Sequence, residues 1–196
     1  MTEMRKPIDQ LPAFVDGDKF VNVVIETSKG GQIKYSYNHE AGLFYAKRLL
    51  PPGMLFPFNF GFVPSTVGDD GDPVDILVLN DVPLVTGCLA RVKLVAVINA
   101  EQTEGGKTFR NDRLVGTLVD EESPPEFLQF KLDQRAVAQI QYFFATYNRF
   151  SGKEFKVLGT GDGDEAKARV REGERKFKEN IGNTEANSEV RLGPSA

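Results

Sequence analysis

Three aspartates in the sequence are spaced closely enough to bind a cation together. Asp70, Asp72 and Asp75 occur within six residues, in the stretch Asp-Gly-Asp-Pro-Val-Asp. Like charges this close repel each other, and a divalent cation would relieve the repulsion. Gly71 allows a sharp turn and Pro73 fixes the next bend, so we expect the carboxylates at the rim of the apolar strand that follows. Carboxylate oxygens are ligands that Mg²⁺, Mn²⁺ and Ca²⁺ prefer.

The same stretch has a plainer interpretation as a surface turn, because Asp, Gly and Pro are the residues that turns use. It does not match an EF-hand loop: counted from Asp70, the sixth position is Asp75 rather than Gly, and the twelfth is Asp81 rather than Glu. Cys88 and His39 are the only cysteine and histidine in the chain. Zinc sites built from several cysteines or histidines are therefore excluded, and a bound metal must be held by oxygen ligands.

Length, composition and charge narrow the class of protein. The chain has 196 residues, of which 40% are hydrophobic and 27% charged, which is ordinary for a globular protein. The net charge of −4 argues against a protein that binds nucleic acid through bulk positive charge. The sequence has no run of about 18 apolar residues, so no membrane span is expected. The N-terminal residues lack an apolar targeting segment, and the cytoplasm is the expected location.

The residues around the acidic stretch predict a chain rich in strands. Residues 54–63 are crowded with aromatic side chains but interrupted by proline and glycine, which indicates an irregular buried segment. Residues 101–111 are polar and contain a Gly-Gly pair, which indicates a loop. Runs of β-branched or alternating apolar residues predict strands over residues 19–26, 32–37, 43–50, 75–79, 87–99 and 112–119.

Two helices are expected after the strands. Residues 133–147 carry apolar side chains at the spacing of one helical face, and Asp133 is a suitable N-cap. Residues 164–178 have a weaker apolar stripe. We expect residues 1–180 to form a single domain and residues 181–196, which are polar and small, to form a mobile tail. These patterns predict a mostly antiparallel barrel or sandwich with two helices.

The acidic stretch also resembles the signature of a known enzyme family. Asp70-Gly-Asp-Pro-Val-Asp75, followed by Ile-Leu-Val, is similar to the signature of the soluble family I inorganic pyrophosphatases. Agreement in the same order over roughly residues 15–180 is more specific than one motif. The other similar segments are Val23-Val24-Ile25-Glu26, Ile33-Lys34-Tyr35, Arg48, Phe56-Pro-Phe-Asn-Phe-Gly61 and Phe143-Phe-Ala-Thr-Tyr147.

This resemblance implies both a fold and an activity. The fold is a five-stranded OB-like barrel with two flanking C-terminal helices, which is α+β and mostly β. The activity is Mg²⁺-dependent hydrolysis of pyrophosphate to two phosphates, without a nucleic-acid or membrane partner. The family resemblance also implies a homo-oligomer, commonly a hexamer in bacteria.

The resemblance assigns roles to the carboxylates. Asp70 and Asp75 match metal-binding aspartates, and Asp72 matches an aspartate associated with activating the attacking water. Glu26 matches a carboxylate that helps to hold a further metal. Where the family has another metal-binding aspartate, the chain has Asn111; Asp112 could substitute only if its strand slipped by one residue, which would reverse its face.

Three further residues match groups that hold the phosphates, namely Lys34, Arg48 and Tyr147. Their chemistry suits that role, because Arg offers phosphate a planar fork of donors and Lys a point charge. A metal would neutralise pyrophosphate and acidify a water, and a nearby carboxylate would accept the proton.

Several positions depart from the family pattern, and these positions belong to the implied active site. Carboxylates, hydroxyls and a lysine are replaced by neutral or unlike groups. Glu101 and Gln102 stand for an acidic pair that is hard to align, and Arg113 stands for a lysine. The replaced positions are Ser36, Lys47, Phe56, Phe60, Asn111 and Asn148.

Three functions are compatible with this mixture. The first is a divergent, active Mg²⁺-dependent pyrophosphatase. The second is a hydrolase of another phosphoanhydride. The third is a protein that binds a phosphorylated ligand without hydrolysing it, or a structural or regulatory subunit. Retention of the aspartates, Lys34 and Arg48 favours the first two functions, and loss of the acidic loop and of two tyrosines favours the third.

Overall fold

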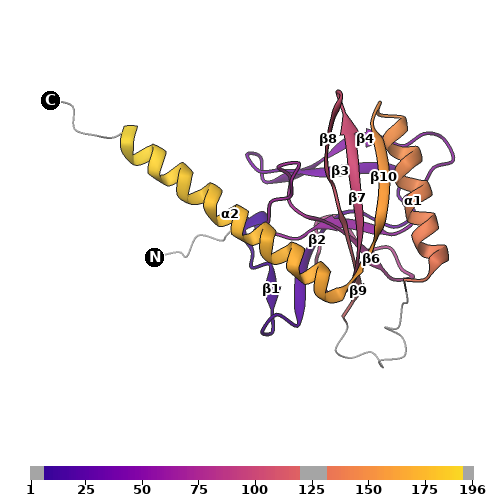
Figure 1. Cartoon of the computed structure of the whole chain (residues 1–196), viewed down its shortest axis with the longest axis horizontal. Helices are drawn as coiled ribbons and strands as arrows, with labels where there is room; N and C mark the ends of the chain where they lie inside the picture. Colours follow the sequence, from indigo (N-terminus) through magenta and orange to yellow (C-terminus); the bar gives the residue numbers. More distant parts are fainter. Residues whose placement is uncertain (1–6, 120–131, 192–196) are drawn as a thin grey trace.

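A closed ring of strands forms the centre of the fold in the computed structural model, which describes residues 7–119 and 132–191 and the side chains up to Gly182 (Figure 1). The ring runs β2–β5–β6–β9–β7, and β7 pairs back with β2. The β6–β9 pair is parallel and the other pairs in the ring are antiparallel. The predicted five-stranded barrel is thus confirmed. Its strands are β2 (Phe20–Thr27), β5 (Asn59–Phe62), β6 (Asp75–Leu79), β7 (Leu89–Glu104) and β9 (Arg113–Leu118).

Shorter elements extend this ring. A 3-10 turn, η1 (Ile8–Gln10), precedes β1, and β1 pairs with β2. Both β8 and β10 pair with β7, beyond and beside the ring. A separate two-stranded sheet is made by β3 and β4. The bounds are β1 (Phe14–Val15), β3 (Ile33–Asn38), β4 (Leu43–Leu49), β8 (Lys107–Arg110) and β10 (Glu154–Asp162).

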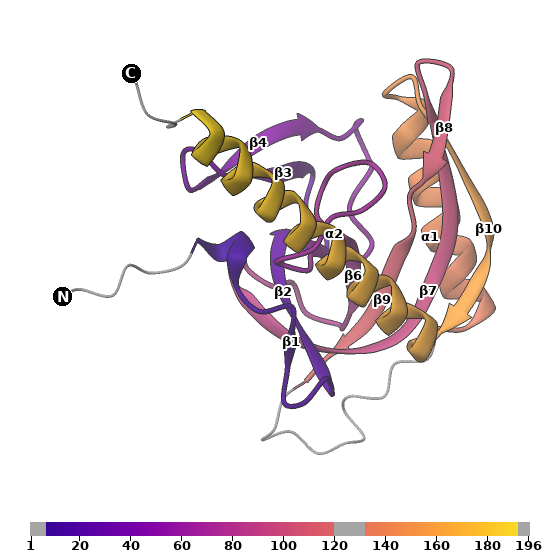
Figure 2. The same ribbon diagram turned by 60° about the vertical axis from the view of Figure 1, so that its left-hand side comes forward.

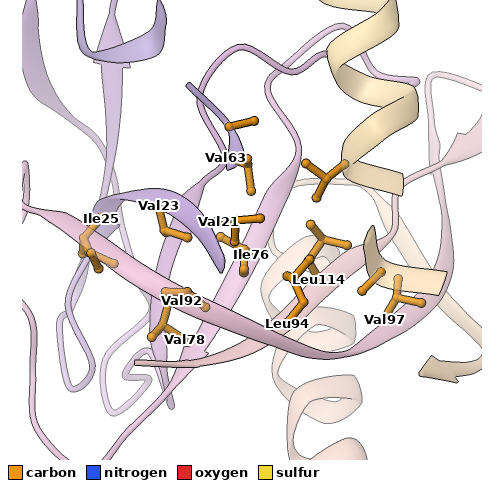
Figure 3. Close-up of a cluster of buried hydrophobic side chains, with 14 residues drawn as sticks. Val21, Val23, Ile25, Val63, Ile76, Val78, Val92, Leu94, Val97 and Leu114 are labelled. Carbon is orange, nitrogen blue, oxygen red and sulfur yellow. The ribbon is translucent and has the colours of Figure 1, made fainter. Parts of the chain in front are cut away.

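Alternating side chains of the ring strands fill two hydrophobic clusters. On β6, Ile76 and Val78 belong to one cluster, while Leu77 and Leu79 belong to the other, as the two-residue period of a strand requires. Figure 3 shows the first cluster, in which side chains from β2, β6, β7 and β9 converge. The apolar runs in the sequence are therefore buried on both faces, which explains why they are nearly continuous.

Each helix covers one cluster. Helix α1 (Gln134–Arg149) contributes Ile140, Phe143 and Phe144 to the second cluster and lies along β10 (Figure 2). Asp133 caps it as predicted, since its Oδ1 accepts a hydrogen bond from the Ala136 amide at 2.8 Å. Helix α2 (Gly163–Arg191) contributes Ala166 and Val170 to the first cluster, and its C-terminal half extends away from the barrel (Figure 1).

Three expectations about elements need correction. The segment 101–111 is not a loop: β7 continues to Glu104, turns at Gly105 and Gly106, and returns as β8. Both glycines have positive φ, 57° and 78°, which is what a tight hairpin turn needs. Strand β5 lies inside the segment expected to be irregular, and β10 was not predicted. Strands β8 and β10 carry many polar side chains, so they lack the apolar alternation by which strands are predicted from sequence.

Helix α2 is also longer than expected, since it does not stop at Lys178 but continues to Arg191. The mobility of residues 181–196 stays a prediction, and residues 192–196 lie outside the described part of the chain. Over the ranges that the structure describes, no helix is long and apolar enough to cross a membrane.

Candidate active site

One cavity of about 280 Å³ brings together nearly all of the predicted site residues. It lies between the β3–β4 hairpin, the rim of the barrel and the end of α1. Asp112 is the exception and does not line it. The predicted residues that do are Glu26, Lys34, Arg48, Asp70, Asp72, Asp75 and Tyr147.

The acidic stretch forms a tight turn before β6. The Gly68 amide donates to the Asp72 carbonyl at 2.7 Å, and Gly71 has a φ of 86°. The Asp72 amide donates to Asp70 Oδ1 at 3.2 Å. The turn leads directly into β6 at Asp75, so a buried strand anchors the last aspartate while the first two face the cavity from the turn.

The electrostatics of this turn favour a cation. Loss of hydration, together with repulsion from Asp75 and Asp72, raises the pKa of Asp70 to about 6, although Arg113 acts in the opposite direction. Within the described ranges, however, no three His, Cys, Asp or Glu side chains are close enough to hold a metal ion alone. Amide oxygens or water would have to complete a metal site here.

Arg113 enters this acidic site from the start of β9. It is 5% exposed, and its Nη1 lies 2.7 Å from Asp75 Oδ2. The same nitrogen donates to Asn111 Oδ1 and to the Asp112 carbonyl. The guanidinium carbon also lies 5.2 Å from the centre of the Phe144 ring. Sequence reasoning gave Arg113 only as the counterpart of a lysine in the family pattern and did not predict its contacts with Asp75 and Asn111.

Two neutral amides lie near Arg113, at positions where the family resemblance predicts acidic groups. Gln102 and Asn111 are 6% and 8% exposed, line the cavity, and are joined by a hydrogen bond from Asn111 Nδ2 to Gln102 Oε1 of 3.1 Å. Asn111 is held in register because its backbone N–H donates to the Ala100 carbonyl at 2.9 Å. Of the poorly aligned pair 101–102, it is Gln102 that faces the cavity, while Glu101 lies 3.5 Å from Lys156.

Asp112 does not line this cavity, and its carboxylate already has other partners, so its role as a metal ligand stays a prediction. Its carboxylate accepts hydrogen bonds from Arg110 at 3.0 and 3.1 Å and from the Ala100 amide at 2.9 Å, and it pairs with Arg169 at 3.0 Å. Neighbouring residues of an extended chain point to opposite faces. Asn111 lines the cavity, whereas Asp112 lines an adjoining pocket under α2 that shares Asp70, Pro73, Asp75 and Asn111 with it.

Basic groups line the same cavity as the acidic turn. Lys34 Nζ lies 2.6 Å from Glu26 Oε2, and both side chains are largely buried. The Tyr37 amide donates to the other oxygen of Glu26 at 3.2 Å. Arg48 lies 5.6 Å from the centre of the Tyr147 ring and donates to Ser151. The cavity can therefore hold an anion on its basic side and a cation on its acidic side.

All of the departures from the family pattern line this one cavity. Phe56 and Phe60 are 2% and 3% exposed, with ring centres 6.0 Å apart, and Lys34 Nζ lies 3.8 Å from the Phe60 ring centre. Asn148 is buried and donates to the Phe144 carbonyl at 2.9 Å. The substitutions thus change the walls of the cavity itself.

The raised pKa of Asp70 makes a prediction about stability. Its folded pKa of about 6 exceeds the ordinary 3.8, so the folded state holds an extra proton between these values and loses stability as pH rises through about 6. Asp70→Asn removes this charge. We expect its Tm, measured in EDTA, to exceed that of the wild type at pH 8 but not at pH 4. Solvent at this exposed residue screens part of the effect, so a gain of order 2–4 °C is expected.

Asp81→Asn is the matched control. The substitution removes the same formal charge, but the Asp81 side chain is 98% exposed and lies on a different loop. It should leave Tm at pH 8 nearly unchanged. An equal gain in both variants would mean that net charge, rather than crowding in the cavity, sets the stability.

The sequence of this chain is similar to those of known proteins. The sequence profile of the family "Inorganic pyrophosphatase" matches residues 23–178. An inorganic pyrophosphatase of Helicobacter pylori is 36% identical over 156 residues, covering 78% of this chain and 87% of its own length. One from Sulfolobus acidocaldarius is 34% identical over 155 residues, covering 76% and 87%.

Solved structures extend the agreement to the fold. The inorganic pyrophosphatase of Thermus thermophilus superposes with a TM-score of 0.78 at 29% identity, over 88% of this chain and 99% of its own. The Helicobacter pylori enzyme gives a TM-score of 0.75 at 32% identity, over 86% and 98%. Because the family profile matches residues 23–178 and the fold and most of the length are shared with these proteins, the chain belongs to the inorganic pyrophosphatase family.

Proposed function

We propose that this protein hydrolyses inorganic pyrophosphate to two phosphates and uses Mg²⁺ to do so. The observation that carries the proposal is the composition of one cavity, which is lined both by the acidic turn at Asp70, Asp72 and Asp75 and by Lys34 and Arg48. A substrate with four ionisable oxygens and a metal of opposite charge would each meet complementary side chains there.

The donor set fits a hard cation. Asp70 and Asp75 supply carboxylate oxygens and Asn111 supplies an amide oxygen, all of which are ligands that Mg²⁺ accepts. The repulsion that raises the pKa of Asp70 is what a cation would relieve. Glu26 becomes available to a further ion only after it parts from Lys34. A bound Mg²⁺ would supply positive charge to the substrate oxygens and acidify a nearby water.

The other residues act on the substrate and on the proton. Asp72, at the rim of the cavity, accepts the proton of the attacking water. The oxygen of that water bonds to phosphorus as the bridging P–O bond breaks, which releases two phosphates. Arg48 presents its fork to phosphate oxygens, and Lys34 a point charge. Tyr147 donates a hydrogen bond from its hydroxyl to a phosphate oxygen. Its ring, which contacts the guanidinium of Arg48, fixes the position of that group.

Measurement of phosphate release tests the proposal. With pyrophosphate as substrate, we expect two phosphates per substrate, a rate that rises with Mg²⁺ and no release in EDTA. Tripolyphosphate and ATP, assayed in parallel, test the alternative that the reshaped cavity serves another phosphoanhydride. Release from one of these at a higher kcat/KM than from pyrophosphate would replace the proposed substrate.

A second function, binding of a phosphorylated ligand without hydrolysis, is favoured by one observation. The buried amides Gln102 and Asn111 hydrogen bond to each other, where carboxylates would have attracted further metal ions. Calorimetry separates the two functions, because a binding protein would take up pyrophosphate with Mg²⁺ and release no phosphate.

Assembly into a homo-oligomer is also part of the proposal. It is supported by apolar side chains that are strongly exposed on a single chain, such as Leu49 and Val85, each 74% exposed. Scattered exposed apolar residues are common, so sedimentation velocity is the deciding measurement, and a single species of 21.7 kDa would contradict assembly.

A further inference from the structure

The position of Arg113 in the acidic site resembles that of a bound cation. One of its nitrogens, Nη1, meets a carboxylate oxygen of Asp75 at 2.7 Å and also donates to the amide oxygen of Asn111. These are two of the three side chains proposed above to hold the metal. The cationic nitrogen therefore stands where the oxygens of two proposed ligands converge.

The surroundings of Arg113 indicate that its ion pair with Asp75 holds the side chain in this position. The side chain is 5% exposed, and its guanidinium carbon lies 5.2 Å and 5.7 Å from the ring centres of Phe144 and Phe155. Its Nε is buried and has no hydrogen-bond partner. A buried cation with an unsatisfied donor is costly unless a counter-charge holds it, and Asp75 is that counter-charge.

We propose that Arg113 is a resident cation that competes with the metal: it neutralises Asp75 while no divalent ion is bound, and Mg²⁺ must displace it. The identity of the metal rests on the proposed function, but the competition does not depend on hydrolysis. Two cations on the same pair of oxygens repel each other, and the interaction is strong where little water screens it. Arg113 thus lowers the affinity of the site for Mg²⁺.

An opposite role is physically possible and makes the proposal testable. A carboxylate has two oxygens, so Arg113 could hold one oxygen of Asp75 and thereby aim the other at the metal. In that arrangement the arginine would be a positioning residue, and its loss would weaken Mg²⁺ binding. The sign of the change in affinity therefore decides between competition and positioning.

The experiment is a calorimetric titration of MgCl₂ into the intact protein without substrate. Arg113→Met removes the charge and keeps an apolar side chain beside the two rings. We expect it to bind Mg²⁺ at least about tenfold more tightly than the wild type, because Asp75 and Asn111 are then free. Arg113→Lys keeps the charge and should stay within about threefold of the wild type.

Arg110→Met is the matched control. Arg110 is the last residue of β8, three residues before Arg113. It donates to Asp112 and Asn99 rather than to Asp75, and it does not line the cavity. Its loss removes the same formal charge and should change Mg²⁺ affinity less than about threefold. Tightening equal to that of Arg113→Met would mean that net charge is responsible and would overturn the proposal.

Unchanged or weaker Mg²⁺ binding in Arg113→Met overturns the proposal, as does a failure of both wild type and variant to bind Mg²⁺. If the methionine variant does not fold, Arg113→Gln, which is neutral and polar, must show the same tightening or the proposal falls. Failure of the proposed function is a separate result: a protein that releases no phosphate but binds Mg²⁺ more tightly without Arg113 supports the competition, and an active enzyme without tightening refutes only the competition.

Discussion

Replacing Asp72 with asparagine is expected to lower kcat for phosphate release by about 10²–10⁴-fold, the contribution that a positioned general base makes. Asparagine keeps the size of the side chain but cannot accept a proton from water. The turn itself should survive, because the hydrogen bonds that Asp72 makes in it use its backbone amide and carbonyl. We therefore expect a large loss in kcat with little change in Tm or in KM.

Asp69→Asn is the matched control for this prediction. Asp69 belongs to the same turn, but its carboxylate pairs with Lys176 of α2 and does not line the cavity. Its kcat should stay within about threefold of the wild type. If Asp72→Asn also kept kcat within that range while remaining folded, another group would have to take the proton, and the assignment of Asp72 would be wrong.

The parts of the fold that sequence predicted well are those with apolar periodicity. The valine-rich β2 and the run from Asp75 to Leu79 fill the barrel, so their patterns record their burial directly. The β7–β8 hairpin extends past the barrel and carries polar side chains, so periodicity marks neither its length nor its pairing. Strand β10 was missed for a similar reason, since glycines and charges dominate its sequence.

The site shows the same division between local and long-range information. The acidic turn is local: the spacing of its three aspartates indicated either a cation site or a surface turn, and the family resemblance then assigned their roles. The face that Asn111 presents depends on the register of β8 and β9 against β7, which is set by pairings distant in sequence. Arg113 and Gln102 enter the cavity through that same register. A one-residue error exchanges Asn111 for Asp112. The family resemblance placed Asn111 at the metal position, but no local sequence pattern fixes this register.

The second large expected effect is a gain in apparent Mg²⁺ affinity, obtained by replacing the neutral amides Gln102 and Asn111. The double variant Gln102→Glu with Asn111→Asp should lower the Mg²⁺ concentration needed for half-maximal rate by at least about tenfold. Both side chains line the cavity and are in contact with each other, and each replacement keeps the shape while adding a negative charge. A carboxylate attracts a divalent ion more strongly than an amide oxygen does.

The new charges also carry a cost that can be measured. They would raise the pKa of Asp70 further and crowd four carboxylates around Arg113, so the variant should be less stable than the wild type in EDTA at pH 8 and gain more in Tm from Mg²⁺.

The substitutions Phe56→Tyr and Phe60→Tyr, which would restore hydroxyls, meet a different constraint. Both rings are packed in an aromatic cluster, and a hydroxyl there needs both space and a hydrogen-bond partner.

Thr103→Glu is the control for the added charge, since Thr103 follows Gln102 on the same strand but meets Thr108 on the opposite face. It should leave the Mg²⁺ requirement within about threefold of the wild type. If the double variant folds but needs as much Mg²⁺ as the wild type, the amides are not substitutes for metal ligands. The cavity would then be built around Arg113 as its cation, and binding of a phosphorylated ligand without hydrolysis would become the better account of this protein.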